Sequence, residues 1–262
     1  GGLSYYLKNG YVADDRTNES VARTLEFALS DYCIAQMAKA LGKTTDYEDL
    51  MRRAKNYRYL YNPKTKLFQA RNADGCWAGE HSGFTEGANW TYQFCVMQDV
   101  QGLIDLMGGN ESFAAALDNV FDNGHYRHDN EPGHHYVYLY NYCGRFDKAQ
   151  ERIPEILDTH YRNGADGLSG NDDCGQMSAW YMFSSLGFYP VTPASGEYAL
   201  GIPRFPSARV ELPHGKVLTV RAEGLKEHKH LPVILFNGKK LDAPFIAIRD
   251  LMKGGVLEFK AE

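Results

Sequence analysis

The spacing of apolar residues changes once along this chain, near residue 190. Up to that point apolar residues recur every three or four positions, which is the period of a helix with one buried face. Beyond about residue 195 they alternate with polar residues or form short runs between turns such as Asn237-Gly238, as in β-strands. We therefore predict a mainly α chain with a C-terminal β domain, with helices over residues 1–190 and a small antiparallel, sandwich-like sheet over residues 191–262.

The first part is expected to hold about seven helices. Their patterns cover residues 21–41, 46–61, 92–107, 113–120, 134–143, 148–157 and 172–186. Gly42, Asn62-Pro63 and Gly108-Gly109 end three of them, because glycine and an Asn-Pro step do not continue a helix. The long loops between these helices carry the polar clusters, which is typical of helical hairpins that present a site at one end.

Composition narrows the classes of partner. The net charge is −5, whereas nucleic-acid-binding proteins carry a basic face, so no nucleic-acid partner is expected. No apolar run reaches the ~18–20 residues that cross a bilayer, so no membrane partner is expected. No signal peptide is visible where the sequence begins at Gly1. The five cysteines form no CxxC pair, which argues against a structural zinc site.

The first polar cluster runs from Phe84 to Tyr92, just ahead of a predicted helix. It places Glu86 beside Trp90 and Tyr92. A carboxyl group against aromatic surface has its charged form desolvated, so its pKa is expected to rise, which suits a general acid. The alternative is a first-turn glutamate that is favoured only by the helix dipole.

The second cluster is His128-Asp-Asn-Glu-Pro-Gly-His-His135. A zinc site of histidine and carboxylate ligands is one interpretation, although Pro132 and Gly133 spoil the helical spacing of an HExxH motif. Oxygen ligands from Asn130, Glu131 and main-chain carbonyls would suit calcium instead. Direct hydrogen bonding to sugar hydroxyls and a plain solvated loop are the other two interpretations.

The third cluster is Asn171-Asp172-Asp173, at the mouth of an apolar and aromatic helix that reaches Leu186. Asn and Asp at this position commonly cap free backbone N–H groups, so a capped buried helix is one interpretation. The other is catalytic, because carboxylates activate water in glycoside hydrolysis. Cys174 as a nucleophile is the rival idea, but two preceding aspartates disfavour a thiolate there.

These clusters resemble motifs of glycoside hydrolase family 92. The similar segments are Glu86-Gly-Ala-Asn-Trp-Thr-Tyr92, Asn130-Glu-Pro-Gly-His-His135 and Gly170-Asn-Asp-Asp-Cys-Gly-Gln-Met-Ser-Ala-Trp-Tyr181. Members of that family are calcium-dependent, inverting α-mannosidases with a β-sandwich followed by an (α/α)6 barrel. The resemblance therefore implies that residues 1–190 are part of such a barrel. It also implies a mannose-containing glycan as substrate and a secreted, periplasmic or cell-surface location.

The resemblance assigns roles to individual residues. Glu86 matches the general acid and Asp173 the general base, and inversion implies roughly 6.5–9.5 Å between their carboxyl groups. The residues implied in substrate binding are Asn130, Glu131, His135, Trp90 and Asp172. Calcium is implied below the mannose ring, where it contacts the 2- and 3-hydroxyls, with His134, nearby main-chain carbonyls and Asn163 as its expected ligands.

The sequence also departs from the family pattern. The first motif reads E-G-A-N-W-T-Y where the family has E-G-N-A-W-Q-Y, so Asn89 is displaced by one position and Thr91 replaces a glutamine. The linkage that is cleaved, α-1,2, α-1,3, α-1,4 or α-1,6, is not assigned by Asn130. The helices amount to about half of a barrel. We therefore expect the N-terminal remainder of a longer protein, or a second chain, to complete it, because a half barrel leaves a long apolar edge exposed.

The sequence-based conclusion is an exo-acting, inverting, calcium-dependent α-mannosidase that acts on mannose-rich glycans. The alternative from another class is a non-catalytic mannan-binding or structural remnant of such an enzyme. A zinc hydrolase that uses the histidine cluster is the third hypothesis.

Overall fold

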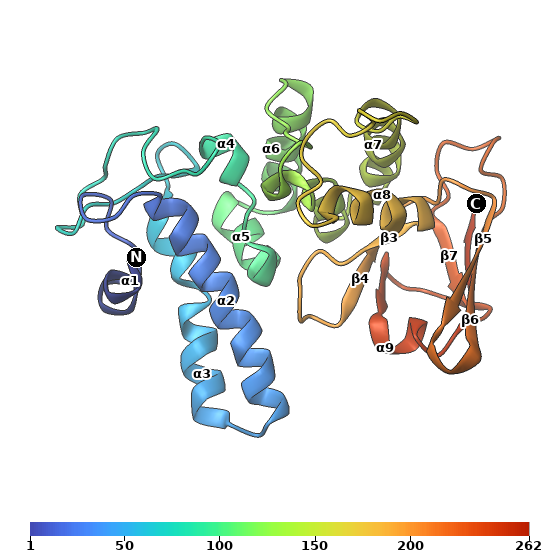
Figure 1. The fold of residues 1–262 in the computed structure, drawn as a ribbon, viewed down its shortest axis with the longest axis horizontal. Coiled ribbons are helices and arrows are strands. Elements are labelled where there is room, and N and C mark those ends of the chain that lie inside the picture. The colour runs from blue at the N-terminus through green and yellow to red at the C-terminus, as the bar shows by residue number, and fades with distance from the viewer. Residues whose placement is uncertain (262) are drawn as a thin grey trace. The chain divides into compact units, whose positions relative to one another are not determined.

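The computed structural model describes residues 1–261, and helices dominate up to residue 186 (Figure 1). The α-helices are α1 (Leu3–Asn9), α2 (Ser20–Ala40), α3 (Thr44–Arg53), α4 (Asn89–Tyr92), α5 (Val100–Met107), α6 (Asn110–Asp122), α7 (Phe146–Thr159), α8 (Gln176–Leu186) and α9 (Ile248–Leu251). The 3₁₀ helices are η1 (Asn56–Leu60), η2 (Met97–Asp99), η3 (Glu131–Gly133), η4 (Tyr136–Cys143) and η5 (Pro213–Gly215). The prediction of a helical part followed by a β part is confirmed at this level.

Most strands lie beyond residue 187. They are β1 (Tyr61–Asn62), β2 (Leu67–Phe68), β3 (Phe188–Tyr189), β4 (Glu197–Leu200), β5 (Ser207–Leu212), β6 (Lys216–Ala222), β7 (Val233–Phe236), β8 (Lys239–Lys240), β9 (Phe245–Ala247) and β10 (Gly255–Lys260). Over residues 1–261 no helix combines the length and the apolar character needed to cross a membrane.

Contacts divide the chain into two compact units. The first unit holds residues 1–112, 118–126 and 193–195, and the second holds residues 113–117, 127–192 and 196 onward. The change from helices to strands near residue 190 therefore falls within the second unit. That residues 1–190 and 191–262 are separate domains therefore stays a prediction.

An antiparallel pair of helices, α2 and α3, organises the first unit (Figure 1). Ala35 and Ala38 on α2 pack against Leu50 on α3, and the small alanines allow the two helices to approach closely. Beside this contact Asp31 is 8% exposed and accepts hydrogen bonds from the Arg53 guanidinium at 2.9 and 3.0 Å. The Tyr6 hydroxyl donates to the same carboxylate at 2.9 Å, so α1 is joined to the pair through a buried charge.

A single break in the helical pattern separates α4 from α5. The apolar spacing predicts one helix over residues 92–107, and this prediction is wrong. The Asp99 side chain accepts a hydrogen bond from the Gly102 N–H at 3.2 Å, which caps a new helix at Val100. The apolar residues thus keep helical spacing although the backbone between the two helices is not helical, with a φ of −133° at Val96.

The second unit contains α7, α8, η4 and two sheets. The larger sheet has the strand order β5-β6-β10-β7-β8. The predicted hairpin turn at Asn237-Gly238 is confirmed, since φ values of 51° and 78° there suit the tight turn between β7 and β8. The smaller sheet has the order β3-β4-β9.

The expectation of a purely antiparallel C-terminal sheet is wrong. Strand β10 pairs antiparallel with β7 but parallel with β6, with Leu257 opposite Val220. The chain leaves β6, builds β7, β8, β9 and α9, and only then returns between β6 and β7. A parallel neighbour requires such a long connection, and no local pattern of alternating residues reveals where the last strand inserts.

The Asp31–Arg53 pair gives a test of what holds the first unit together. Replacing Asp31 with Ala is expected to lower the free energy of unfolding by about 3 kcal/mol, because it leaves a mostly buried guanidinium without its partner. Asp49→Ala is the matched control, since the Asp49–Arg52 pair within α3 is 61–71% exposed, and it should cost less than about 1 kcal/mol. Equal effects of the two variants in urea denaturation would contradict this account.

Candidate active site

Glu86 lies in the first unit, in the loop between β2 and α4, and its side chain is exposed. The loop is fixed on both sides of it. Upstream, the Gly83 carbonyl accepts hydrogen bonds from the Val21 and Ala22 N–H groups at the start of α2, at 2.9 and 3.1 Å. Downstream, the Tyr92 hydroxyl donates to the Thr85 carbonyl at 2.8 Å.

The two aromatic neighbours predicted for Glu86 have their own partners. Tyr92 is buried, which raises its pKa to about 12, and its ring lies 5.6 Å from that of Phe84. Trp90 stacks on His125, with ring centres 4.6 Å apart and planes within 6°. The indole of Trp90, four residues after Glu86, thus forms a flat surface with the imidazole of His125.

The Asp172-Asp173 segment lies in the second unit and is not helical. Helix α8 begins at Gln176, four residues later than the start predicted for it at residue 172. Asp173, Cys174 and Gly175 have φ values of 42°, 59° and 95°, and a right-handed helix cannot contain positive φ. The predicted helix is therefore preceded by a left-handed turn.

The two aspartates have different roles in this turn. The Asp172 carboxylate accepts hydrogen bonds from the Ser178 N–H and hydroxyl, both at 2.8 Å, so Asp172 caps α8 from outside the helix. These bonds, the one from the backbone N–H first, lower the pKa of Asp172. The Asp173 side chain is exposed. Capping, one of the alternatives left open by the sequence, thus falls on Asp172.

Glu86 and Asp173 share an unusual backbone conformation. Glu86 has a φ of 50° and Asp173 a φ of 42°. Left-handed backbone costs an ordinary residue about 1 kcal/mol or more, and such residues persist where the surroundings impose them, often at functional sites. Glu19, Lys66, Cys174 and His214 share this conformation, so it does not by itself distinguish these two carboxylates.

The loop of the second motif packs against that of the third. A Cβ atom at Gly170 would overlap the backbone of Asp129, so only glycine permits this approach. The Asp129 carboxylate is held by Arg127 at 2.6 and 2.7 Å, and these hydrogen bonds lower its pKa. The second unit therefore brings residues 128–135 and 170–176 together, as the hypothesis of one site requires.

Three histidines line the junction between these loops. The ring of His128 lies 4.9 Å from that of His134 and 5.0 Å from that of His160, and it meets Trp180 edge-on at 4.4 Å. Burial lowers the pKa of all three, and that of His128 falls to about 2. His128 and His134 thus belong to the core, and His128 is neutral there.

Hydrogen bonds fix the tautomers of two of these rings. The Tyr161 hydroxyl donates to the Met177 carbonyl at 3.0 Å, so it accepts from His128 Nε2 at 2.7 Å. His134 Nε2 lies 3.0 Å from the His128 carbonyl and must donate to it. His134 Nδ1 is then an acceptor and faces the Gln176 side-chain amide at 3.3 Å.

The remaining predicted substrate ligands lie around the same loop. Asn130 begins η3, where its Oδ1 atom accepts the Glu131 N–H at 3.2 Å. Glu131 is partly exposed and follows Asn130 directly, so both can face a ligand. His135 is 4% exposed and meets the ring of Tyr136 edge-on at 5.0 Å, which places it in the core.

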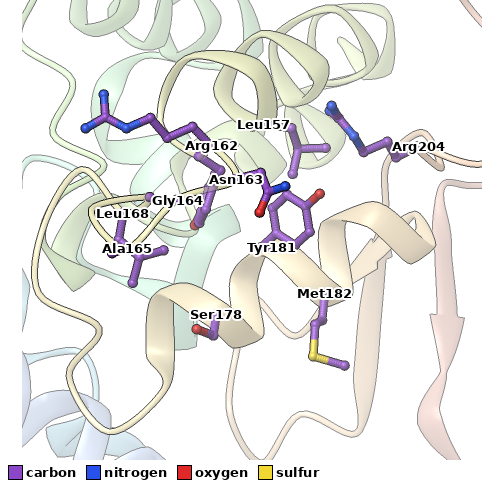
Figure 2. Close-up of a pocket in the computed structure, with 12 residues that line it drawn as sticks. Leu157, Arg162, Asn163, Gly164, Ala165, Leu168, Ser178, Tyr181, Met182 and Arg204 are labelled. Carbon is purple, nitrogen blue, oxygen red and sulfur yellow. The ribbon is translucent and has the colours of Figure 1, made fainter.

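A pocket of about 740 Å³ lies beside this region within the second unit. Figure 2 shows it between the loop carrying Asn163 and the face of α8 that carries Ser178 and Met182. Its two cations are already paired, Arg162 with Asp166 and Arg204 with Asp158. Ser178 is also the residue that holds Asp172, so the pocket adjoins the Asp172–Asp173 turn.

The predicted calcium ligands do not form a metal site as they stand. Over residues 1–261 no group of three or more His, Cys, Asp or Glu side chains is placed to hold a metal ion. Both ring nitrogens of His134 are hydrogen-bonded, and its carbonyl accepts the Trp180 Nε1–H at 2.8 Å. Asn163 faces the pocket on another side of α8. The assignment of these two residues to a metal stays a prediction.

Sequence reasoning missed the residues that join the two loops. Gln176 connects them through His134, and Tyr161 connects them through His128 and Met177. Gln176 also donates to the Tyr189 hydroxyl at 3.1 Å. The sequence offered one indication, which is that Gln176 lies inside the third motif. The bonds of Gln176 to His134 and of Tyr161 to His128 join residues 42 and 33 positions apart, which no spacing rule gives.

The neutral histidines predict a pH dependence of stability. The pKa of His128 is about 2 in the folded chain and 6.5 when solvated, so below pH 6.5 the unfolded state binds the extra proton. Stability is therefore full above pH 6.5 and falls with decreasing pH, by about 1.4 kcal/mol per unit for this residue. Thermal unfolding between pH 7 and 5 should show this slope, and His128→Gln should flatten it.

His214 provides the control for that experiment, because it is an exposed histidine in the same unit. His214→Gln should leave the slope unchanged. An equal slope in the wild type and in His128→Gln would contradict the neutral, buried state of His128.

Comparison with known proteins identifies the family. The model of the glycosyl hydrolase family 92 catalytic domain matches residues 1–262. An uncharacterized secreted glycosidase of the fungus Arthroderma benhamiae is 28% identical over 299 aligned positions, which cover 98% of this chain and 38% of that protein.

Two solved structures from the bacterium Bacteroides thetaiotaomicron are similar throughout. A family GH92 inverting mannosidase has a TM-score of 0.92 and 35% identity over 99% of this chain, and a family GH92 α-mannosidase has a TM-score of 0.94 and 42% identity over 98%. The second was also solved in complex with mannoimidazole. This chain spans 39% and 36% of the lengths of those two. By this match along its whole length, the chain belongs to glycosyl hydrolase family 92.

Proposed function

We propose that this chain carries the general acid and the general base of an exo-acting, inverting α-mannosidase that removes terminal mannose from mannose-rich glycans. Family membership and the similarity to an inverting mannosidase and to an α-mannosidase support the reaction class. The observation that carries the assignment of residues is the division of work between Asp172 and Asp173. Asp172 caps α8, which leaves the exposed Asp173 carboxylate for chemistry.

In the proposed reaction Asp173 accepts a proton from a water molecule, whose oxygen attacks the anomeric carbon of the terminal mannose. Glu86 gives its proton to the glycosidic oxygen as the bond to the anomeric carbon breaks. The attack comes from the face opposite the departing oxygen, so the product is β-mannose. Room for that water implies roughly 6.5–9.5 Å between the two carboxyl groups.

The substrate is proposed to contact the surfaces next to these carboxylates. Asn130 and Glu131 offer an amide and a carboxylate for sugar hydroxyls, and the stacked Trp90 offers an apolar face for a sugar ring. Asp172 and His135, which were also predicted as substrate ligands, are mainly engaged by the protein, through Ser178 and through the core. We propose that these two act on substrate binding by shaping the loops.

Calcium remains part of the proposal on the strength of the family resemblance. It prefers six to eight oxygen ligands, so main-chain carbonyls and oxygen atoms beyond His134 and Asn163 would have to supply most of them. When bound, it would polarise the mannose hydroxyls. The acid and base steps above use only side chains of this chain.

We further propose that the helices belong to an (α/α)6 barrel completed by the remainder of a longer protein or by a second chain. The similar structures are more than twice as long as this chain, which supports this view. A secreted, periplasmic or cell-surface location is proposed from the description of the fungal relative as secreted.

The test of the proposal follows the anomer of the released mannose by proton NMR, with the protein in the form that contains its complete barrel. The wild type should release β-mannose first. Glu86→Gln should lower kcat/KM on glycans by about 10²–10⁴-fold but spare mannosides with good leaving groups, which need no protonation. Asp173→Asn should abolish turnover of both, because no group is left to activate water.

Glu80→Gln is the matched control, since Glu80 is an exposed carboxylate in the same loop, and it should retain full activity. Release of α-mannose would sink the inverting mechanism. Full activity of Glu86→Gln on glycans would sink the acid assignment. Binding of mannan without any mannose release would favour a non-catalytic remnant instead.

Removal of metal gives a separate prediction. Treatment with a calcium chelator should abolish mannose release, and added calcium, but not zinc, should restore it. Initial rates and elemental analysis of the purified protein measure both effects. Unchanged rates after verified removal of calcium would contradict calcium dependence, and restoration by zinc alone would favour a zinc hydrolase.

A further inference from the structure

The left-handed turn that carries Asp173 depends on few hydrogen bonds of its own. The Asp172 carbonyl accepts the N–H groups of Gly175 and Gln176 at 3.1 and 2.7 Å, and the Asp173 carbonyl accepts the Gln176 N–H at 3.2 Å. The backbone N–H of Gln176 is therefore shared by the carbonyls of both aspartates. Whatever fixes Gln176 fixes the end of this turn.

The side chain of Gln176 is held at the same time by two buried acceptors. Its Nε2 atom lies 3.3 Å from His134 Nδ1 and 3.1 Å from the Tyr189 hydroxyl. An amide nitrogen has two hydrogens, and each of these atoms can take one. The Gln176 amide is thus clamped between the Asn130–His135 loop and strand β3.

Both acceptors are themselves immobile. His134 is 1% exposed, and its other ring nitrogen donates to the His128 carbonyl at 3.0 Å. Tyr189 is 7% exposed and stacks on Tyr138, with ring centres 5.1 Å apart and planes within 14°. The Gln176 side chain therefore ties the turn to the packed core of the second unit.

The body of α8 has other anchors. The Trp180 Nε1–H donates to the His134 carbonyl at 2.8 Å, and the Met177 carbonyl accepts the Tyr161 hydroxyl at 3.0 Å. Trp180 is fully buried. The helix is thus held from its second residue onward without the Gln176 side chain. Asp172 is bonded to Ser178 on the helix, which leaves residues 173–176 as the segment that the clamp controls.

We propose that Gln176 is a positioning residue for Asp173: its amide, clamped by His134 and Tyr189, holds the left-handed turn in the one geometry that presents the Asp173 carboxylate to the reacting water. His134 acts here through its ring as a hydrogen-bond acceptor. This inference rests on the proposed function for the identity of Asp173 as the base. The claim that Gln176 holds the turn does not depend on the proposed function.

The test replaces Gln176 with Leu, which keeps the size of the side chain and removes the amide. Hydrogen exchange of the Gly175, Gln176 and Met177 amides should become at least tenfold faster, while the amides of the last turn of α8 stay unchanged. Gln101→Leu is the matched control, because that glutamine donates to Asp105 on an exposed helix surface. It should change neither set of amides.

The kinetic arm separates positioning from a general loss of structure. Gln176→Leu should lower kcat at least tenfold with KM within twofold, because binding surfaces remain while the base is misplaced. Tyr189→Phe removes one of the two acceptors and keeps the ring, so it should show the same split to a smaller extent. Gln101→Leu should leave both constants unchanged.

The outcomes distinguish this inference from the proposed function. Unchanged exchange in Gln176→Leu overturns the clamp whatever the activity. Faster exchange with an unchanged kcat, or with a rise in KM alone, overturns positioning. A ¹⁵N spectrum that places the proton of His134 on Nδ1 also overturns it. If the wild type releases no mannose, the proposed function fails, and the exchange data alone decide whether Gln176 holds the turn.

Discussion

The candidate site depends on how the start of α8 is capped. A helix begins with free N–H groups, and an aspartate in the preceding loop is a strong partner for them. Here Asp172 takes that role through Ser178, and the chain reaches the helix through a left-handed turn. Because one carboxylate satisfies the helix, its neighbour Asp173 is exposed and free of the capping role.

The second requirement is a core that keeps two loops together without charge. His128 and His134 are buried and neutral, and their ring nitrogens bond to Tyr161, to a backbone carbonyl and to Gln176. A polar network of this kind has few alternative arrangements, since each donor faces one acceptor. It therefore holds the Asn130–His135 loop and the Asp172–Asp173 turn against the same buried residues. The consequence is sensitivity to acid, which charges the histidines only in the unfolded chain.

Glu86 and Asp173 also have a strained backbone conformation. Glu86 and Asp173, in different compact units, both have positive φ values although neither is glycine or asparagine. In each unit the neighbouring residues impose this conformation, through Gly83 and Thr85 in one and through Asp172 and Gln176 in the other. Left-handed backbone at such residues costs of order 1–3 kcal/mol each and persists where the surroundings hold it.

The sequence by itself determined the family, the order of the three motifs, the helix over residues 20–40 and the turn at Asn237-Gly238, because each is written in a local pattern. It did not give the start of α8, since the apolar spacing does not reveal the left-handed turn at residues 173–175. Nor did it give the parallel pairing of β10 with β6, which follows from where the chain returns. The contact of Gln176 with His134 was likewise decided by tertiary structure, because folding brings together two residues 42 positions apart. Capping by Asp172 through Ser178 is local, and the sequence had offered it as one interpretation.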